Sequence, residues 1–477
     1  MSGLDTPLTS EEIERVQRAN WRRYYSVDLA NRQAGFCRNP IHLAPKYKGE
    51  WMGPTPDTVR QNGYEMTYPI RCGSRLAERC PSCSILYGID ANRLVYLGLA
   101  GDGDNVPLTV SQNPALWSTL TLPSLGPVHH YVERQPGKPG ICHPGKRTFC
   151  EHGTLISCGK IHKKDDPELG TPLCPDCYGL EDQVLANATA PELWDRFLNT
   201  ELPRALAKVL KIPARKLQNY LKIEAVKTSE MQGRLAVHFH ACIRLDGPGS
   251  QGSAPKKPVT DAGLVKAFQM AVSRTVIRKT FTTGKGDLSP VTREFRFGKQ
   301  VDVVSINAAN AKFFANYTSK YATKSATEAA GFAREFRSLK QILAIPDKDW
   351  WPRLMACVAF KMGEDPRYKK LRLAEHAHTF GYGGWFITKT RRWSVTFGML
   401  KQLRVKWVLD HLDRENPEYT NVDPSLFENE DITWAPVAFG WLTPLDARFN
   451  RMWWKERVRA VQDYLDDLKF FRELEAA

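Results

Sequence analysis

The sequence contains no run of apolar residues long enough to cross a membrane. A spanning helix needs about 18 or more such residues, and no stretch of these 477 residues approaches that length. The opening segment MSGLDTPLTSEEIERV also has neither the basic end nor the apolar stretch of an export signal. We therefore expect a cytoplasmic protein with no membrane partner.

Acidic residues are outnumbered by basic ones. The 67 Lys and Arg residues against 52 Asp and Glu residues give a net charge of +15 and a pI near 9.2. This balance favours a polyanionic partner, nucleic acid first, although a basic soluble surface would look the same. The chain also lacks the Gly-x-x-x-x-Gly-Lys-Ser/Thr loop that cradles nucleotide phosphates, so we expect no nucleotide cofactor.

The chain length of 477 residues corresponds to about three domains. We predict an α+β protein with an N-terminal zinc-binding module at 1–105, a central domain at 106–330 and a basic, mainly helical C-terminal domain at 331–477. The central domain holds the β-branched segment WSTLTLPS and a Gly/Pro/Cys/His-rich insert at about 136–180. Other expected elements are helices at 11–25, after Cys83, at 261–280, 308–324 and 334–343, a short strand at 301–305 and a loop at 246–260.

The eleven cysteines include two Cys-Pro-x-Cys pairs. In a reducing compartment such pairs predict zinc rather than disulfides, since each offers two thiolates from one tight turn. We favour two closed structural zinc sites, with a single shared zinc or free thiols as alternatives. The candidate ligands are Cys37, Cys72, Cys80 and Cys83 for the first site and Cys150, Cys158, His162, Cys174 and Cys177 for the second, where His152 and Cys142 compete.

A β-hairpin is predicted from LKIEAVKTSE and RLAVHFHACIRL, turning at 232–234. Odd positions of the second strand are apolar or small, whereas His238 and His240 share the opposite face, because alternate side chains of a strand point to opposite sides. Counting back across the turn places Glu230 opposite His238, with Glu224 as the weaker alternative. Two imidazoles and a carboxylate suit Mg²⁺ or Mn²⁺. Two histidines on a solvated sheet face are the competing interpretation.

In the segment KFFANYTSKYATKSA, Tyr317 and Tyr321 lie four residues apart, as do Lys320 and Lys324. Each pair therefore shares one face of a helix. A phenol is a weak nucleophile at its free pKa of about 10, and a nearby metal or cation would be needed for it to attack a phosphodiester. The lysines could contact a phosphate. A buried aromatic stripe is the competing interpretation.

Three motifs follow one another along the chain: WSTLTLPSLGPVH (117–129), LAVHFHACIRLDG (235–247) and NYTSKYATKSA (316–326). In this order they resemble the HUH endonuclease superfamily, and more closely the actinobacterial plasmid and integrative-element replication initiators called RepSA-like. Flanking segments such as CPSCSILYGIDANRLVYLGLAG and GTPLCPDCYGL resemble the same family. The resemblance therefore extends over most of the chain.

The resemblance implies an HUH core, a central antiparallel sheet flanked by helices, with both histidines on a middle strand facing the tyrosine helix. It implies that His238 and His240 are metal ligands and that Glu230 fits the acidic third ligand. Many plasmid initiators match only the second half of Tyr-x-x-Lys-Tyr-x-x-Lys, so Tyr321 is the first choice of nucleophile and Tyr317 its partner or spare.

The activity implied is a site-specific nick through a 5′-phosphotyrosine that primes rolling-circle replication, followed by rejoining. The expected partners are origin DNA, single-stranded at the nick, and a host helicase and polymerase. An HUH transposase or relaxase would share this chemistry, but relaxases usually have three histidines and an early tyrosine. A non-catalytic, zinc-containing DNA-binding regulator is the alternative from another class.

DNA contacts are predicted at two places. Thr119 and Thr121 lie in the first motif. The basic stretch TKTRRWSVTFGMLKQLRVKW combines cations for phosphates with aromatics for stacking, although the aromatics could instead form a core. Its predicted DNA-binding residues are Lys389, Arg391, Arg392, Lys401 and Arg404.

Overall fold

The computed structural model describes residues 30–64, 66–283, 288–323, 332, 334–410, 426 and 429–459. The side chains at positions 62, 321–323 and 405–410 fall outside that description. The helix predicted over 11–25 and Lys324 also lie outside the described residues. Among the helices that are described, none is both long and apolar enough to cross a membrane.

The chain forms two compact units, which we call the sheet unit (Gly88–Phe397) and the terminal unit (Met1–Tyr87 with Gly398–Ala477). This division differs from the predicted boundaries at 105 and 330. Residues 331–397 belong to the sheet unit, and the two ends of the chain share the terminal unit. Two strands within 331–477 pair with distant partners, β12 (Ile387–Lys389) with β7 (Lys222–Met231) and β13 (Ile432–Phe439) with β1 (Ile41–Tyr47).

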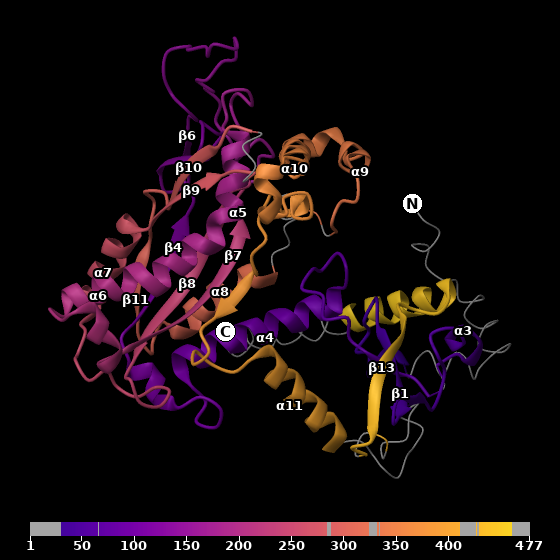
Figure 1. The fold of residues 1–477 in the computed structure, drawn as a ribbon. Helices are drawn as coiled ribbons and strands as arrows, with labels where there is room; N and C mark the ends of the chain where they lie inside the picture. The colour runs from indigo at the N-terminus through magenta and orange to yellow at the C-terminus, as the bar shows by residue number, and fades with distance from the viewer. Residues whose placement is uncertain are drawn as a thin grey trace, which may run out of the picture. The chain divides into compact units, whose positions relative to one another are not determined.

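A five-stranded antiparallel sheet organises the sheet unit, in the order β11-β4-β8-β7-β12. The predicted first-motif strand, hairpin and short later strand all form, so the fold is α+β with a central antiparallel sheet. Figure 1 shows β4, β8 and β7 side by side with α5 across them. The strands are β4 (Ala115–Thr121), β7 (Lys222–Met231), β8 (Val237–Asp246), β11 (Val303–Ile306) and β12 (Ile387–Lys389).

Helices cover both faces of this sheet. The larger core lies on the face of β8 that carries Val237 and Phe239, against α5 (Leu180–Arg196), α6 (Leu202–Val209), α7 (Asp261–Arg274) and α10 (Trp350–Met362). A smaller core lies on the other face, where side chains of α4 (Pro81–Ala100) and α8 (Ala311–Thr323) meet Cys242. Consequently every residue of β8 is buried, and the histidine face is not the solvated face that the alternation would allow.

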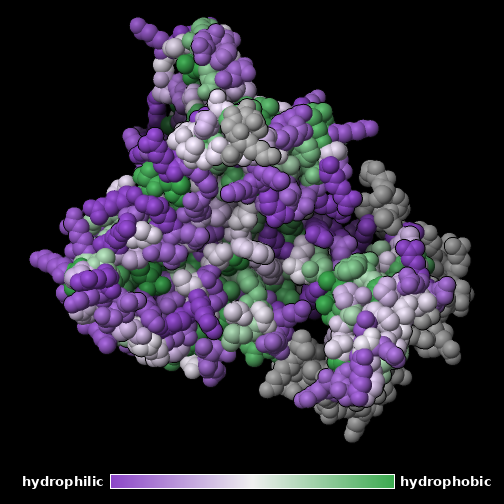
Figure 2. Space-filling view, viewed as in Figure 1, coloured by the Kyte–Doolittle hydropathy of each residue, from purple (hydrophilic) through white to green (hydrophobic). Residues whose placement is uncertain are grey.

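The helix predicted over 261–280 is shorter than expected. It ends at Arg274, and β9 (Val276–Phe281) follows and pairs with β10 (Val291–Arg296). The partner strand lies ten residues further along, so periodicity within 261–280 alone could not reveal it. The insert contains a small hairpin, β5 (Val132–Gln135) with β6 (Lys138–Gly140). On the face shown in Figure 2, hydrophilic side chains predominate over the sheet unit and hydrophobic groups are scattered.

The terminal unit is built around β1 (Ile41–Tyr47), which pairs with two strands that follow it closely and with one strand far along the chain. Its partners are β2 (Glu50–Trp51), β3 (Tyr68–Ile70) and the distant β13 (Ile432–Phe439). The unit also contains helix α3 (Val59–Asn62), the first turns of α4 and a helical segment at 444–459. Two further helices are α9 (Leu339–Leu343) in the sheet unit and α11 (Phe397–Asp410), nearly all of which belongs to the terminal unit.

Candidate metal and nucleophile site

Two histidines and a glutamate converge on the central strand of the sheet. His238 and His240 project from the same face of β8, and the register places Glu230 of β7 directly opposite His238, as the sequence count predicts. A carboxylate oxygen of Glu230 lies 3.1 Å from Nε2 of His240. One potential ligand atom from each of the three residues lies within 4.8 Å of the others. Glu224, the weaker alternative, instead accepts a hydrogen bond from Thr390 at 2.5 Å.

The environment keeps this histidine pair suited to binding a cation. Only 8% of His238 and 2% of His240 is exposed. Burial and the neighbouring His240 lower the pKa of His238 to about 4. His238 is therefore neutral at pH 7 and has a lone pair to offer, which is the form in which imidazole binds metal ions. The donor set of two nitrogens and one carboxylate thus fits a single divalent ion.

The two threonines of the first motif lie beside the histidines and are buried. Thr121 lies opposite His238 across β4 and β8, and its hydroxyl is 2.7 Å from Nδ1 of the ring. Thr119 lies opposite His240, and its hydroxyl donates to the Asp302 carboxylate at 3.0 Å. Both threonines are at most 5% exposed. Both hydroxyls make contacts within the protein, and that of Thr121 touches a candidate ligand; their predicted role as DNA contacts stays a prediction.

The helix that carries the tyrosine motif lies directly on this face of the sheet. The ring centroid of Tyr317 is 5.6 Å from that of His240 and 5.3 Å from that of Trp117. The backbone of α8 is held on β7 by Thr228, whose hydroxyl donates to the Thr318 carbonyl at 3.1 Å. The half-buried Tyr317 therefore stands beside the histidine pair.

Of the remaining residues of the motif, the structure describes some side chains and not others. The side chain of Lys320 is exposed, one turn after Tyr317. The side chain of Tyr321 and all of Lys324 lie outside the described residues. Only part of the aromatic stripe is core, because Phe314 is buried while Phe313 is 62% exposed. The described part of α8 thus combines one packed aromatic with one phenol at the candidate metal site.

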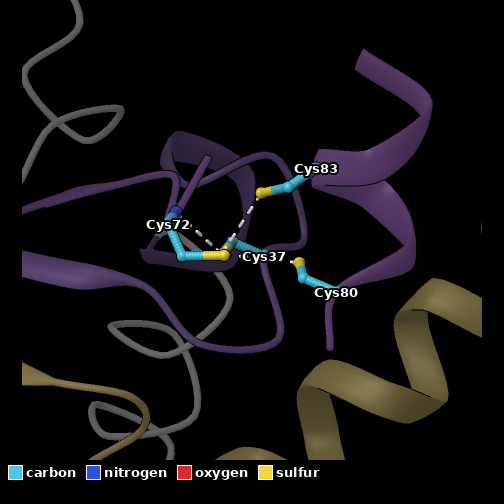
Figure 3. Close-up of side chains that lie close together, drawn as sticks. All are labelled: Cys37, Cys72, Cys80 and Cys83. Carbon is cyan, nitrogen blue, oxygen red and sulfur yellow. Dashed lines mark hydrogen bonds between the residues drawn. The ribbon is translucent and has the colours of Figure 1, made fainter. Parts of the chain in front are cut away.

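The first predicted cysteine group assembles as expected. Cys37, Cys72, Cys80 and Cys83 point toward one another in the terminal unit (Figure 3), and the sulfur of Cys37 lies 3.7 Å from that of Cys80 and 3.5 Å from that of Cys83. Hydrogen bonding within the group, with Cys37 first and then Cys72, lowers the pKa of Cys83, which favours a thiolate. All four sulfurs lie within 4.8 Å of one another, so this group could hold a metal such as zinc.

The cysteines and histidines of the insert divide differently from the prediction. Cys158 and His162 do not join the second Cys-Pro-x-Cys pair, whose partners are Cys150 and the competitor His152. They instead meet Cys142 and His129, in a group of four potential ligands separate from the Cys37 group and from the group of Cys150, His152, Cys174 and Cys177. Sequence reasoning missed His129, which stands just before the insert in the pair His129-His130. Spacing could not separate the two groups because their members alternate along the chain.

The basic stretch after β12 is divided between two environments. Arg391 is exposed, whereas the Lys389 ammonium turns back and donates to the Ser394 carbonyl at 3.0 Å. Burial lowers the pKa of Lys389. Arg392 lies 3.9 Å from Glu224. Trp393 is fully buried, so this aromatic belongs to a core and is not available for stacking on a base. Lys401 and Arg404 lie on α11 in the terminal unit.

One buried cation escaped the sequence analysis. Lys227 of β7 projects from the face opposite the histidines and is only 3% exposed. Its ammonium donates to Ser229 at 2.9 Å and to the Trp385 carbonyl at 3.1 Å, and it lies 4.7 Å from the centre of the Phe239 ring. Burial lowers the pKa of Lys227 to about 7. The alternating pattern of the strand could have placed Lys227 on the face opposite the histidines, but it could not have shown that the side chain is buried.

Comparisons with known proteins point to DNA replication. Residues 24–454 match the sequence profile of the RepSA family, described as "Replication initiator protein, pSAM2". A curated "Replication initiator protein" from Streptomyces ambofaciens is 35% identical over 415 residues, which cover 84% of this chain and 83% of that protein. No solved structure matches the chain.

Proposed function

Since the chain belongs to the RepSA family of replication initiator proteins, we propose that it starts rolling-circle replication by nicking one strand of its origin DNA. The observation that carries this proposal is the position of Tyr317 against His240, in a site that also contains His238 and Glu230. A metal-binding group, a phenol and a basic chain are together what transfer of a DNA phosphate to tyrosine requires. We also propose that the sheet unit is an HUH core, which the central histidine strand and the adjacent tyrosine helix support.

The candidate metal ligands are His238, His240 and Glu230. A bound Mg²⁺ or Mn²⁺ would polarise the scissile phosphate. Thr121 holds the His238 ring through Nδ1, which directs Nε2 toward the site. Because an imidazole binds through one nitrogen while the other is hydrogen-bonded, this contact makes Thr121 a positioning residue.

In the proposed reaction the phenolic oxygen of Tyr321 attacks the phosphorus at the nick site. A bond forms between that oxygen and the phosphorus, the bond to the 3′ oxygen breaks, and the proton lost by the phenol is balanced on the departing 3′ hydroxyl. Tyr317, beside His240, serves the second transfer that rejoins the strand. Lys320 and Lys324 contact neighbouring phosphates. No ATP is consumed because the phosphotyrosine conserves the bond.

Structural zinc and DNA binding complete the proposal. Zinc at the Cys37 group would hold the N-terminal loops of the terminal unit. A second zinc would bind Cys174, Cys177 and their partners. Arg391, Lys401 and Arg404 would contact the DNA backbone, and host helicase and polymerase would extend the freed 3′ end.

A cleavage assay on single-stranded oligonucleotides that tile the element's origin tests the proposal. We expect a cut with Mn²⁺ but not with EDTA, leaving a covalent protein-DNA adduct. Tyr321→Phe and Tyr317→Phe assign the two transfers, and their combination abolishes the adduct, whereas Tyr220→Phe, outside the site, leaves cleavage unchanged. Failure to cut at every position while DNA binding persists would instead identify a non-catalytic regulator.

A further inference from the structure

The metal-binding side chains of the insert occur in four pairs, and the pairs alternate between two groups. The first and third pairs meet in one group, and the second and fourth pairs meet in the other. We infer that residues 129–177 form a cross-braced module with two zinc ions, so that the chain holds three structural zincs rather than two. In chain order the pairs are His129 with Cys142, Cys150 with His152, Cys158 with His162, and Cys174 with Cys177.

The distances within the first group match tetrahedral zinc. Zinc bonds of about 2.3 Å to sulfur and 2.0 to 2.1 Å to nitrogen place neighbouring ligand atoms roughly 3.3 to 3.8 Å apart. Here Nε2 of His162 lies 3.4 Å from the Cys158 sulfur and 3.2 Å from Nδ1 of His129. Cys142 is fully buried, and His162 is 1% exposed. The second group has similar spacings, with Nδ1 of His152 at 3.2 Å from the Cys177 sulfur and 3.9 Å from the Cys174 sulfur.

A carboxylate behind the first group provides an independent sign of metal binding. Asp166 Oδ2 lies 2.7 Å from Nδ1 of His162, the nitrogen that faces away from the other three ligands. Metal-binding histidines commonly donate their second ring N–H to a carboxylate, which fixes the tautomer and orients the ring. With its proton held on Nδ1, His162 presents the Nε2 lone pair to the group. The Glu168 carboxylate, which pairs with Lys160 at 2.8 Å, lies further from the same Nδ1, at 3.9 Å.

The insert has almost nothing else to hold it together. Within 129–177, all of which the structure describes, the buried hydrophobic side chains are only those of Cys142, Leu173 and Cys174, and two of these three are candidate ligands. A segment of this length without a core needs metal ions or disulfides for stability, and all of its cysteines are free. Each group combines two ligand pairs that are separated in the chain by a pair of the other group. The two ions together would therefore link all four pairs and hold the loops between them.

The module is also joined to the proposed nicking site. The backbone of His129 exchanges hydrogen bonds with the 170–171 segment, from Gly170 N to its carbonyl at 2.8 Å and from its own N to Thr171 at 2.9 Å. Gly170, at φ +87°, passes so close to Gly233 that a Cβ atom at Gly170 would collide with the Gly233 backbone. Gly233 lies in the turn between β7 and β8. The zinc module therefore supports the turn of the hairpin that carries Glu230 and His238.

Elemental analysis of the purified full-length protein tests this inference by counting zinc. We expect three equivalents per chain, a Cys72→Ser variant with two, and a His129→Ala variant with two or fewer. The adjacent His130→Ala is the matched control and keeps three, although His130 also lies near Cys142.

Two equivalents in the wild-type protein would overturn the third site, as would an unchanged count in His129→Ala. Zinc loss in His130→Ala rather than His129→Ala would assign Cys142 to a different group and also overturn it. Should His129→Ala fail to fold, thiol modification of the wild-type protein with colorimetric detection of released zinc still gives the decisive count. None of these results depends on DNA cleavage, so they are separate from the proposed nicking activity.

Discussion

Replacing Thr121 with valine should weaken metal binding and still leave the protein folded. Thr121 supplies the 2.7 Å contact to Nδ1 of His238, in a site where the imidazole is only 8% exposed. Valine keeps the shape of threonine but cannot hydrogen-bond. The amide nitrogen of Gln232 remains 3.3 Å from the same Nδ1. An amide N–H can only donate, so it would favour the tautomer that carries its proton on Nε2, the nitrogen needed for the metal.

The expected loss follows from what such partners contribute elsewhere. Removing a hydrogen-bond partner of a metal-binding histidine typically lowers metal affinity about 10- to 100-fold, which corresponds to about 1.4 to 2.7 kcal/mol. Because Gln232 stays beside the ring, the loss of this one hydrogen bond lowers the free energy of unfolding by about 0.5 to 1.5 kcal/mol. The fold should therefore survive the substitution, and metal affinity can be measured on the folded variant.

The matched control is Thr119→Val. Thr119 lies on the same strand and face, is 4% exposed against 5% for Thr121, and hydrogen-bonds Asp302 rather than a histidine. Titration calorimetry with Mn²⁺ should show weaker binding for Thr121→Val alone, while urea unfolding shows similar destabilisation of both variants. Equal Mn²⁺ affinities for the two variants, or an affinity of Thr121→Val equal to wild type, would refute the assignment of Thr121 as a positioning residue.

Two further predictions concern packing and buried charge in the sheet unit. The pKa of Lys227, about 7 when folded, lies below its ordinary value of about 10.4, so the unfolded chain binds more protons between these values and wild-type stability rises with pH there. Lys227→Met should therefore have a higher free energy of unfolding than wild type at pH 6. In urea unfolding, the difference between the two proteins should shrink by up to about 1.4 kcal/mol per pH unit above pH 7. A difference that stays constant with pH would contradict this prediction. A Cβ at Gly98 would collide with the Trp393 ring, whereas one at Gly145 meets nothing within 4 Å. Gly98→Ala should lower the melting temperature, because the collision lowers the free energy of unfolding by about 1 to 3 kcal/mol. Equal melting temperatures for Gly98→Ala and Gly145→Ala would contradict this, because they would mean that the core around Trp393 can rearrange to accept the methyl group.

The hairpin with its metal ligands could be predicted because everything it depends on is local. A strand alternates its side chains whatever it packs against, and a short turn sets the register of its two strands. Counting residues was therefore enough to place Glu230 opposite His238. The two Cys-Pro-x-Cys pairs are local for the same reason. The spacing of four residues between Tyr317 and Tyr321 likewise needs only a helix.

The rest required the tertiary structure because it depends on partners far apart in the chain. The pairing of β1 with β13 joins the two ends of the chain, and neither strand specifies the other by composition. Helices α4 and α8 bury the histidine face, which the strand pattern alone left open to solvent. Lys227 looks like an ordinary polar position of a strand, and only the packed helices around it lower its pKa.

The sequence by itself determined which residue types could bind metal and attack a phosphate, because the family's motifs and the periods of strand and helix are written in neighbouring residues. Only the tertiary structure decided which ligands meet. His129 and Cys142 meet Cys158 and His162 rather than the intervening Cys150 and His152, and the Thr121 hydroxyl contacts a histidine ring inside the protein. These contacts arise where separate segments cross, and the distance along the chain between two residues does not fix their distance in space.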